Sequence, residues 1–475
     1  MASNAAAVTL AKPLICNDTH SQLNMTSMLG TIEPRSVADV CSAVQKVSKR
    51  GDHIAIAGGR HAMGGQQFAT KAWLLDMRGM DQVLSFDREG GLLKTEAGIM
   101  WPDLIRHYVV AQAGAKRQWG IGQKQTGADR LTLGGAVAAN IHGRGLSMQP
   151  FIQDIEALDI VLADGSEVTC SRTQRSDLFR HVVGGYGLFG VVTAVTLRLR
   201  ERQKVQRVVE INHINEIMDT FDQRKRDGYL YGDFQFSTDP KDPDFLGRGV
   251  FSCYRPVESI VEMTKNPIRL TPDKWRRLLY LAHKDKNRAF EEFADFYLRS
   301  SGQIYWSDTH QLSLYLDDYH GELDRAMGAT TRGSEAITEL YVPPEQLPAF
   351  MQAVRKDFLQ NDVDLIYGTV RLIEADCETA LPWAKESYAC IIFNLHIDHC
   401  ESSIETSAGH FRRLIDLAIA HGGSYFLTYH RHASIDQVLG CYPELPAFLE
   451  QKLIYDPDEL FQSDWYRHYR QLLAL

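Results

Sequence analysis

The sequence lacks the long apolar run that a membrane-spanning helix needs. Nowhere among its 475 residues do about 18 apolar residues follow one another. It also lacks a basic start followed by an apolar segment, so we expect no signal peptide. Lysines and arginines form no cluster, and the net charge is −9. These absences predict a protein with no membrane span and no nucleic-acid partner.

Paired cysteines are also missing. The eight cysteines are scattered and none forms C-x-x-C, so the sequence gives no zinc or redox-pair signature and we predict no metal site. Scattered thiols suit a reducing compartment, which favours a cytoplasmic location. The composition is that of an ordinary globular protein, with 44% hydrophobic and 23% charged residues. The length predicts two or three domains.

Several elements can be read from local patterns in the first part of the chain. Apolar residues at helical spacing predict a helix over residues 32–51, with Ser36 as its cap. A second helix is expected over 101–114, because Pro102 suits a helix start and Gly114 a helix end. The segment 155–171 reads as two strands joined by an Asp-Gly turn, and 190–200 alternates as one strand.

The character of the sequence changes near residue 205, where charge and aromatic content rise and the glycine-rich loops end. We predict domain boundaries there and at residue 423, which divide the chain into 1–205, 206–423 and 424–475. The middle region mixes expected strands, such as 388–397, with expected helices over 344–360 and 410–423.

Two small-residue loops are candidates for ligand binding. Residues 58–66 follow a short strand, and their glycines let backbone N–H groups converge on a phosphate or pyrophosphate. The alternative is a glycine-rich turn that binds nothing. Residues 133–145 are rich in Gly and Ala, so a flat ring such as a flavin can lie against their backbone. A tightly packed turn without a ligand is the alternative there.

A third glycine motif, residues 185–190, matches G-x-G-x-x-G. A dinucleotide fingerprint of this kind needs a strand before it and a helix after it. Here the pattern predicts a helix before and a strand after. We therefore reject a Rossmann site and do not expect NAD.

Taken in order, these segments resemble one family. The helix near residue 36, the loop IAIAGGRHAMGG, the loop TLGGAVAANIHGRG and the run 155–197 are similar to the FAD-linked oxidases of the vanillyl-alcohol oxidase type, also called the PCMH-type FAD-binding fold. Within it the chain most resembles sugar, alditol and lactone oxidases and decaprenylphosphoryl-ribose oxidase. The resemblance implies an α+β, two-domain protein that binds FAD beneath a substrate (cap) domain built on an antiparallel sheet. Its C-terminal segment should return to the FAD-binding domain.

The resemblance also implies which residues contact FAD. His61 is the expected site of a covalent bond to the flavin 8α-methyl group, although Arg60 and Ala62 replace the Gly and Ser that flank this histidine in many relatives. The alternative is a histidine that only forms hydrogen bonds. His142 is expected beside the flavin ring. The full implied set is Gly58, Gly59, Arg60, His61, Ala62, Met63, Gly64, Thr132, Gly135, Asn140, His142, Gly143, Val191, Val192 and Phe426.

Five residues are candidates for the chemistry. By resemblance, Arg371 is a cation near flavin and substrate, where it would stabilise developing negative charge. Glu339, His396, Tyr429 and His430 are the candidate bases, and the sequence does not choose among them. Strand period two puts Cys390, Ile392, Asn394 and His396 on one face.

The implied reaction is oxidation of a CH–OH group of a small polyol, sugar or lactone, with hydride transfer to flavin N5. Two alternatives stay open: a flavin-dependent 2-hydroxy acid dehydrogenase, for which Arg371 would bind the carboxylate, and a flavin-binding protein without catalysis. Oxygen or another acceptor would reoxidise the flavin. The expected partners are thus a hydroxylated small molecule and an electron acceptor.

Overall fold

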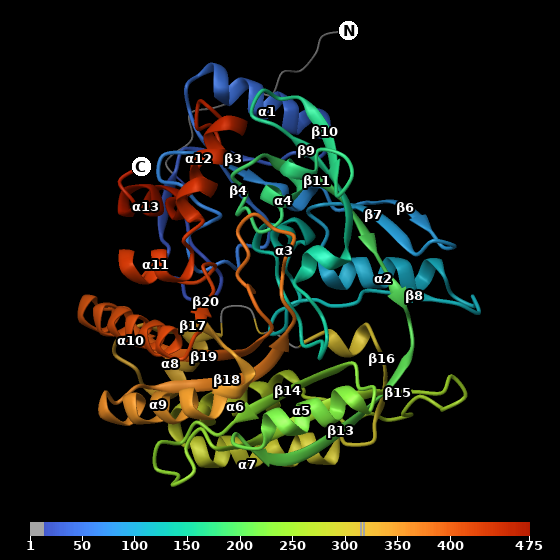
Figure 1. Ribbon diagram of the computed structural model, residues 1–475, viewed down its shortest axis with the longest axis vertical. Coiled ribbons are helices and arrows are strands. Elements are labelled where there is room, and N and C mark those ends of the chain that lie inside the picture. The colour runs from blue at the N-terminus through green and yellow to red at the C-terminus, as the bar shows by residue number, and fades with distance from the viewer. Residues whose placement is uncertain (1–13, 314–315, 317–318) are drawn as a thin grey trace.

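The computed structural model describes residues 14–313, 316 and 319–475 (Figure 1). Helices and strands of the first 200 residues lie at one end of the molecule, together with the C-terminal helices, and a large sheet forms the other end. The expected α+β class with an antiparallel sheet is confirmed. The described residues contain no helix long and apolar enough to cross a membrane.

Two sheets form the first end of the molecule. A small parallel sheet has the order β3 (Gly30–Ile32), β5 (Trp73–Asp76), β4 (Ile54–Ala57). A five-stranded antiparallel sheet has the order β10 (Glu167–Ser171), β9 (Ile155–Val161), β11 (Val191–Arg198), β7 (Leu92–Glu96), β6 (Val83–Asp87). Short pairs complete this end: β1 (Leu14–Cys16) with β2 (Thr26–Met28), and β8 (Trp119–Gly120) with β12 (Arg200–Glu201).

Four helices accompany these sheets: α1 (Val37–Lys49), α2 (Trp101–Ala111), α3 (Leu133–Ala139) and α4 (Ser176–Val182). Ser36 caps α1 as predicted, since its side chain accepts a hydrogen bond from the Asp39 N–H. Helix α2 ends before Gly114, whose φ of +78° is the left-handed conformation that stops a helix. Around the rejected G-x-G-x-x-G motif, α4 precedes and β11 follows, in the predicted order.

An eight-stranded antiparallel sheet forms the other end, with the order β16 (Ile304–Trp306), β13 (Lys204–His213), β15 (Arg248–Val257), β14 (Tyr231–Phe236), β18 (Leu365–Ile373), β19 (Tyr388–Asp398), β17 (Gly333–Val342), β20 (Ser424–Tyr425). Its long central strands are almost wholly buried, which explains their continuous apolar stretches.

Helices accompany this sheet (Figure 1): α5 (Ile217–Arg226), α6 (Pro272–Lys284), α7 (Lys286–Arg299), α8 (His320–Met327), α9 (Leu347–Gln360) and α10 (Glu401–Ala420). Helix α9 and the second half of α10 agree with the helices predicted over 344–360 and 410–423. Helix α10 begins nine residues before the predicted start at 410, because polar residues of its first two turns gave no apolar period.

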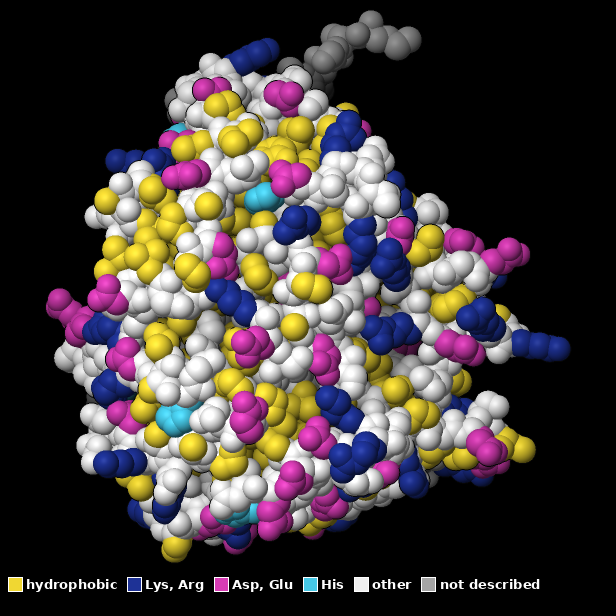
Figure 2. Space-filling view, viewed as in Figure 1, with side chains coloured by type: hydrophobic (Ala, Val, Ile, Leu, Met, Phe, Trp, Pro, Cys, Tyr) yellow, Lys and Arg dark blue, Asp and Glu magenta, His cyan; other side chains and the backbone are white. Residues whose placement is uncertain are grey.

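The C-terminal segment crosses between the two ends of the molecule. Strand β20 pairs with β17, and the chain continues into α11 (Ile435–Cys441), α12 (Leu445–Tyr455) and α13 (Asp464–Leu472). Phe461 then forms a parallel bridge with Ile54 of β4. The Ile54 N–H donates to the Leu460 carbonyl, and the Gln462 N–H donates to the Ile54 carbonyl, both at 2.8 Å. On the surface, charges of both signs are interspersed over the face shown (Figure 2).

Candidate functional site

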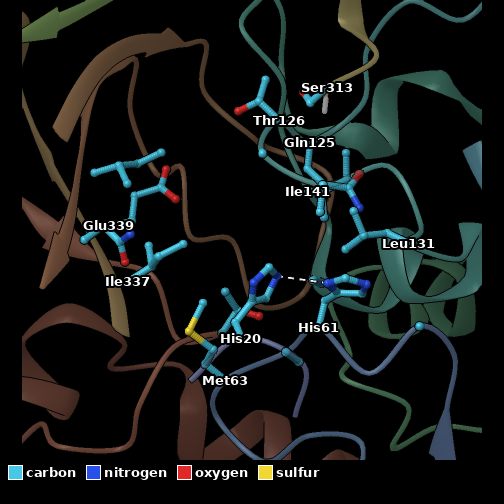
Figure 3. A pocket seen from close by; sticks show the side chains of 18 of the residues that line it. His20, His61, Met63, Gln125, Thr126, Leu131, Ile141, Ser313, Ile337 and Glu339 are labelled. Atoms are coloured by element: carbon cyan, nitrogen blue, oxygen red, sulfur yellow. Dashed lines mark hydrogen bonds between the residues drawn. The ribbon is translucent and has the colours of Figure 1, made fainter. Parts of the chain in front are cut away.

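A cavity of about 950 Å³ lies where the two ends of the molecule meet. This volume is at the upper end of the range of small-molecule sites, about 300–1,000 Å³. One wall comes from the loops at 56–63 and 125–142, and the opposite wall from β17, β18 and β19. Figure 3 shows Ile337 and Glu339 on one side of the cavity, with His61, Leu131 and Ile141 across from them.

Glycines let two loops come into contact at the base of the cavity. A Cβ atom on Gly58 would lie 2.0 Å from Thr132 Oγ1, and one on Gly59 would lie 2.6 Å from the Arg130 carbonyl oxygen. Both positions therefore exclude a side chain. Thr132 is also the N-cap of α3, because its hydroxyl accepts a hydrogen bond from Gly135 N–H. The glycine loop and the start of α3 form one continuous backbone cradle.

Arg60 is fixed beside this cradle by a buried carboxylate. Its Nη2 atom lies 2.8 Å from Asp76 Oδ2, and Arg78 Nη2 approaches the same oxygen at 2.6 Å. Burial alone would raise the pKa of Asp76, but Arg78 and then Arg60 hold that pKa below its usual value. Asp76 is thus ionised between two cations, and Arg60 itself lines the cavity.

His61 forms a hydrogen-bonded pair with His20, which the sequence analysis did not identify. His61 Nδ1 lies 2.9 Å from His20 Nε2, and His61 Nε2 lies 3.1 Å from the Arg130 carbonyl oxygen (Figure 3). Burial, followed by the neighbouring His61, lowers the pKa of His20 to about 3. His20 is therefore a neutral imidazole at physiological pH, and both rings line the cavity.

A buried acid occupies the opposite wall. His142 Nε2 lies 2.6 Å from Glu339 Oε1, and the Tyr429 hydroxyl donates to Glu339 Oε2 at 3.2 Å. Burial raises the pKa of Glu339, but His142, then Arg371 and Tyr429, lower it more, so the pKa lies below its usual value. An ionised carboxylate therefore faces the cavity from β17, beside a histidine from the other wall.

Arg371 supplies a cation to this wall from β18. Its side chain is buried and lines the cavity, and its Nε atom has no hydrogen-bond partner within the described residues. A buried N–H without a partner is costly, so it marks a place where a ligand oxygen would be stabilised. Cys390 lies directly across the sheet from Arg371, and burial raises the pKa of its thiol.

The cavity brings together most of the predicted residues. Those that line it are Gly58, Gly59, Arg60, His61, Ala62, Met63, Thr132, Gly135, His142, Val192, Phe426, Glu339, Arg371 and Tyr429. Those outside its lining are Gly64, Asn140, Gly143, Val191, His396 and His430. The rejected glycine motif also contributes, since residues 186–190 line the same cavity.

The predicted residues outside the lining have other contacts. Asn140 hydrogen-bonds to Asp376 and to the Ile152 N–H, and a Cβ on Gly64 would lie 2.5 Å from the Tyr429 carbonyl oxygen. His430 is half-buried and stacks on His432. His396 points toward Glu335, a residue that the sequence analysis did not single out.

Residues 28–171 match the family model for an FAD binding domain. A cytokinin dehydrogenase 9 of Oryza sativa is 26% identical over 262 residues, covering 50% of this chain and 49% of the relative. An uncharacterized oxidoreductase from the fasciation locus of Rhodococcoides fascians is 30% identical over 191 residues, covering 39% and 40%. A Neurospora crassa protein provisionally named a D-arabinono-1,4-lactone oxidase is 27% identical over 168 residues, covering 35% and 29%. The chain thus aligns with no more than half the length of each of these relatives.

Proposed function

We propose that this protein is an FAD-dependent oxidoreductase. The proposal starts from residues 28–171, which match the family model for an FAD binding domain of the PCMH type. Its substrate in this proposal is the CH–OH group of a small polyol, sugar or lactone. The observation that carries it is the buried Glu339 carboxylate, held 2.6 Å from His142 on the wall of a large cavity.

The residues present fit FAD. Gly58 and Gly59 let their loop pack against Arg130 and Thr132, and this contact puts glycine backbone on the cavity wall, where a pyrophosphate or ring can lie close to it. Arg60 adds a positive charge beside it. His61 lines the same cavity, and we propose that it forms the covalent bond to the flavin. Bound FAD would supply the acceptor for the hydride that leaves the carbinol carbon.

The protein's own groups would manage the proton and the oxygen of the substrate. Glu339 is ionised, so it can accept the hydroxyl proton as the C–H bond breaks and a carbonyl forms. His142 and Tyr429 fix the orientation of that carboxylate. Arg371, with its Nε–H free of a partner in the described residues, would stabilise negative charge on the substrate oxygen.

A 2-hydroxy acid is the second candidate substrate, because the same buried Arg371 can pair with a carboxylate.

The eight free thiols support a reducing compartment, as in the cytoplasm. In this proposal oxygen or another acceptor reoxidises the flavin.

The test is to purify the protein with its flavin and mix it without oxygen with a panel of polyols, sugars, lactones, 2-hydroxy acids and cytokinins. We expect bleaching of the flavin absorbance by a hydroxylated compound, and a rate lower by about 10²–10⁴-fold in Glu339→Gln. Glu374→Gln is the matched control, because Glu374 pairs with Lys225 outside the cavity. If only cytokinins bleach the flavin, the proposed substrate class is wrong and cytokinins take its place. If no compound bleaches the flavin, the result supports the non-catalytic alternative.

A further inference from the structure

A second polar cluster is centred on Glu335 of β17, four residues, or two repeats of the strand pattern, before Glu339. Its members, here called the Glu335 cluster, are Glu335 of β17, His283 of α6, His320 of α8 and His396 of β19. The side chains of Glu335, His283 and His320 are 3–4% exposed, and that of His396 is 23% exposed. Four separate elements thus bring three imidazoles to one buried carboxylate.

The distances in this cluster are short. His283 Nε2 lies 3.1 Å and His396 Nδ1 lies 3.9 Å from Glu335 Oε1, while His320 Nδ1 lies 3.0 Å from Oε2. One ligand atom from each of His283, Glu335 and His396 falls within 4.8 Å of the other two. Two ligands about 2.1 Å from a shared Zn²⁺ ion stand about 3.4 Å apart at the tetrahedral angle. Shifts of a few tenths of an ångström to about 1 Å in side-chain position would therefore create a coordination site.

Hydrogen bonding within the protein leaves part of the cluster unsatisfied. Glu335 accepts hydrogen bonds from His283 and from the Tyr319 hydroxyl. The Nδ1 atoms of His320 and His396 are buried, 3.0 Å and 3.9 Å from the Glu335 oxygens, but among the described residues neither forms a well-directed hydrogen bond. Buried ring nitrogens are normally satisfied, and a metal ion is one way to satisfy them.

The backbone holds this arrangement in place. Glu335 and His396 are direct partners across the β17–β19 pair, so their side chains leave the same face of the sheet. A Cβ on Gly333 would lie 2.5 Å from His396 Cε1, so the glycine makes room for the imidazole. The rings of His283 and His396 meet edge to face, with centroids 5.0 Å apart.

We propose that His283, Glu335 and His396 bind a divalent transition-metal ion, with Zn²⁺ as the best match to two imidazoles and one carboxylate. His320, beside the second carboxylate oxygen, orients Glu335. Glu335 and His320 both line the cavity, so the remaining coordination position faces the space that the substrate would occupy.

This position suggests a role in recognition. Glu335 and Glu339 are four residues apart on β17, which is about 13 Å along a strand. The metal would therefore lie at the end of the cavity away from the carbon that is oxidised, and it would bind an oxygen of a substrate long enough to reach both ends. This role rests on the proposed function, whereas metal binding itself does not.

The test begins with the flavin-loaded protein, stripped with a chelator, incubated with Zn²⁺ and freed of excess ion. We expect about one Zn²⁺ per chain by mass spectrometry, and X-ray absorption should show only nitrogen and oxygen ligands at about 2.0–2.1 Å. His283→Gln and Glu335→Gln should each lose the ion while they keep the flavin spectrum of a folded protein. His213→Gln is the matched control, because His213 pairs with Asp244 outside the cluster.

Equal zinc contents in wild type and the folded His283→Gln variant would overturn the proposal, and so would sulfur ligands in the absorption spectrum. If a variant fails to fold, a rise in the melting temperature of the stripped wild-type protein on Zn²⁺ addition decides the question, and no rise counts against the site. Zinc bound without any substrate oxidation would keep the metal site and contradict the proposed function instead.

Discussion

His20 Nε2 lies 2.9 Å from Nδ1 of His61, the residue that we propose to bond to the flavin. Because burial keeps His20 neutral, with a pKa of about 3, His20 is an uncharged hydrogen-bond partner that fixes the orientation of His61. We predict that His61→Ala releases all flavin on acid precipitation and that His20→Ala lowers the fraction retained in the pellet. Full retention in His20→Ala would show that His61 needs no such support.

The second prediction concerns the acidic limb of the pH–rate profile. Glu339 must be ionised to accept a proton, so activity should be lost as the pH falls through its pKa. Tyr429 is one of the groups that lower this pKa, after His142 and Arg371. Tyr429→Phe should therefore move the acidic limb of kcat/KM to higher pH. Tyr388→Phe, on β19 but outside the cavity lining, should leave the profile where it is.

A third prediction tests the backbone cradle. In Gly58→Ala the new Cβ would meet Thr132 Oγ1 at 2.0 Å, so the two loops must separate and flavin binding should fall by at least tenfold. Gly440→Ala is the control, because its Cβ meets nothing within 4 Å and the residue lies in helix α11. That change should stabilise the protein by up to about 1 kcal/mol. Equal flavin affinity in both variants, measured by titration of the apoprotein, would argue against close contact at Gly58.

The fourth prediction concerns acid stability. Burial lowers the pKa of His430 to about 4 from 6.5, so the unfolded chain binds a proton at a higher pH than the folded protein does. The free energy of unfolding should thus fall as the pH drops from about 6.5 to about 4. In His430→Phe this dependence should be shallower, as denaturant unfolding at several pH values would reveal. Parallel curves for the two proteins would contradict a His430 that stays neutral in the folded protein.

Local signals in the sequence predicted the elements that depend on local interactions. Helix α1 was placed by its Ser36 cap and apolar spacing, and the β9–β10 hairpin by its Asp164-Gly165 turn. Helices α6 and α7 were not expected, although Leu278 and Leu281 of α6 follow a helical period. Their region contains no sequence motif that marks a helix start or end, and the apolar residues there also suit a strand.

The site was only partly predictable, because only some of its residues lie in segments with an unusual local composition. His61, His142 and Gly58 lie in glycine-rich loops whose composition is unusual, so they could be found. His20 becomes notable only through His61, 41 residues away, and Glu335 only through histidines on three other elements, and a single sequence records no such pairing. Period two put Ile392, Asn394 and His396 on one face of the strand without saying what that face contacts. In the structure Ile392 and Asn394 line the cavity, whereas His396 points toward Glu335.

The bridge between Ile54 and Phe461 has a consequence for how the protein is made. The cavity wall includes Phe426 and Tyr429, and β4, which leads into the glycine loop, is hydrogen-bonded to residues 460–462. During synthesis from the N-terminus the glycine loop emerges early, but its supports emerge last. Stable cofactor capture therefore has to wait until nearly the whole chain has left the ribosome, so a ribosome stalled before residue 426 would carry a nascent chain without its flavin.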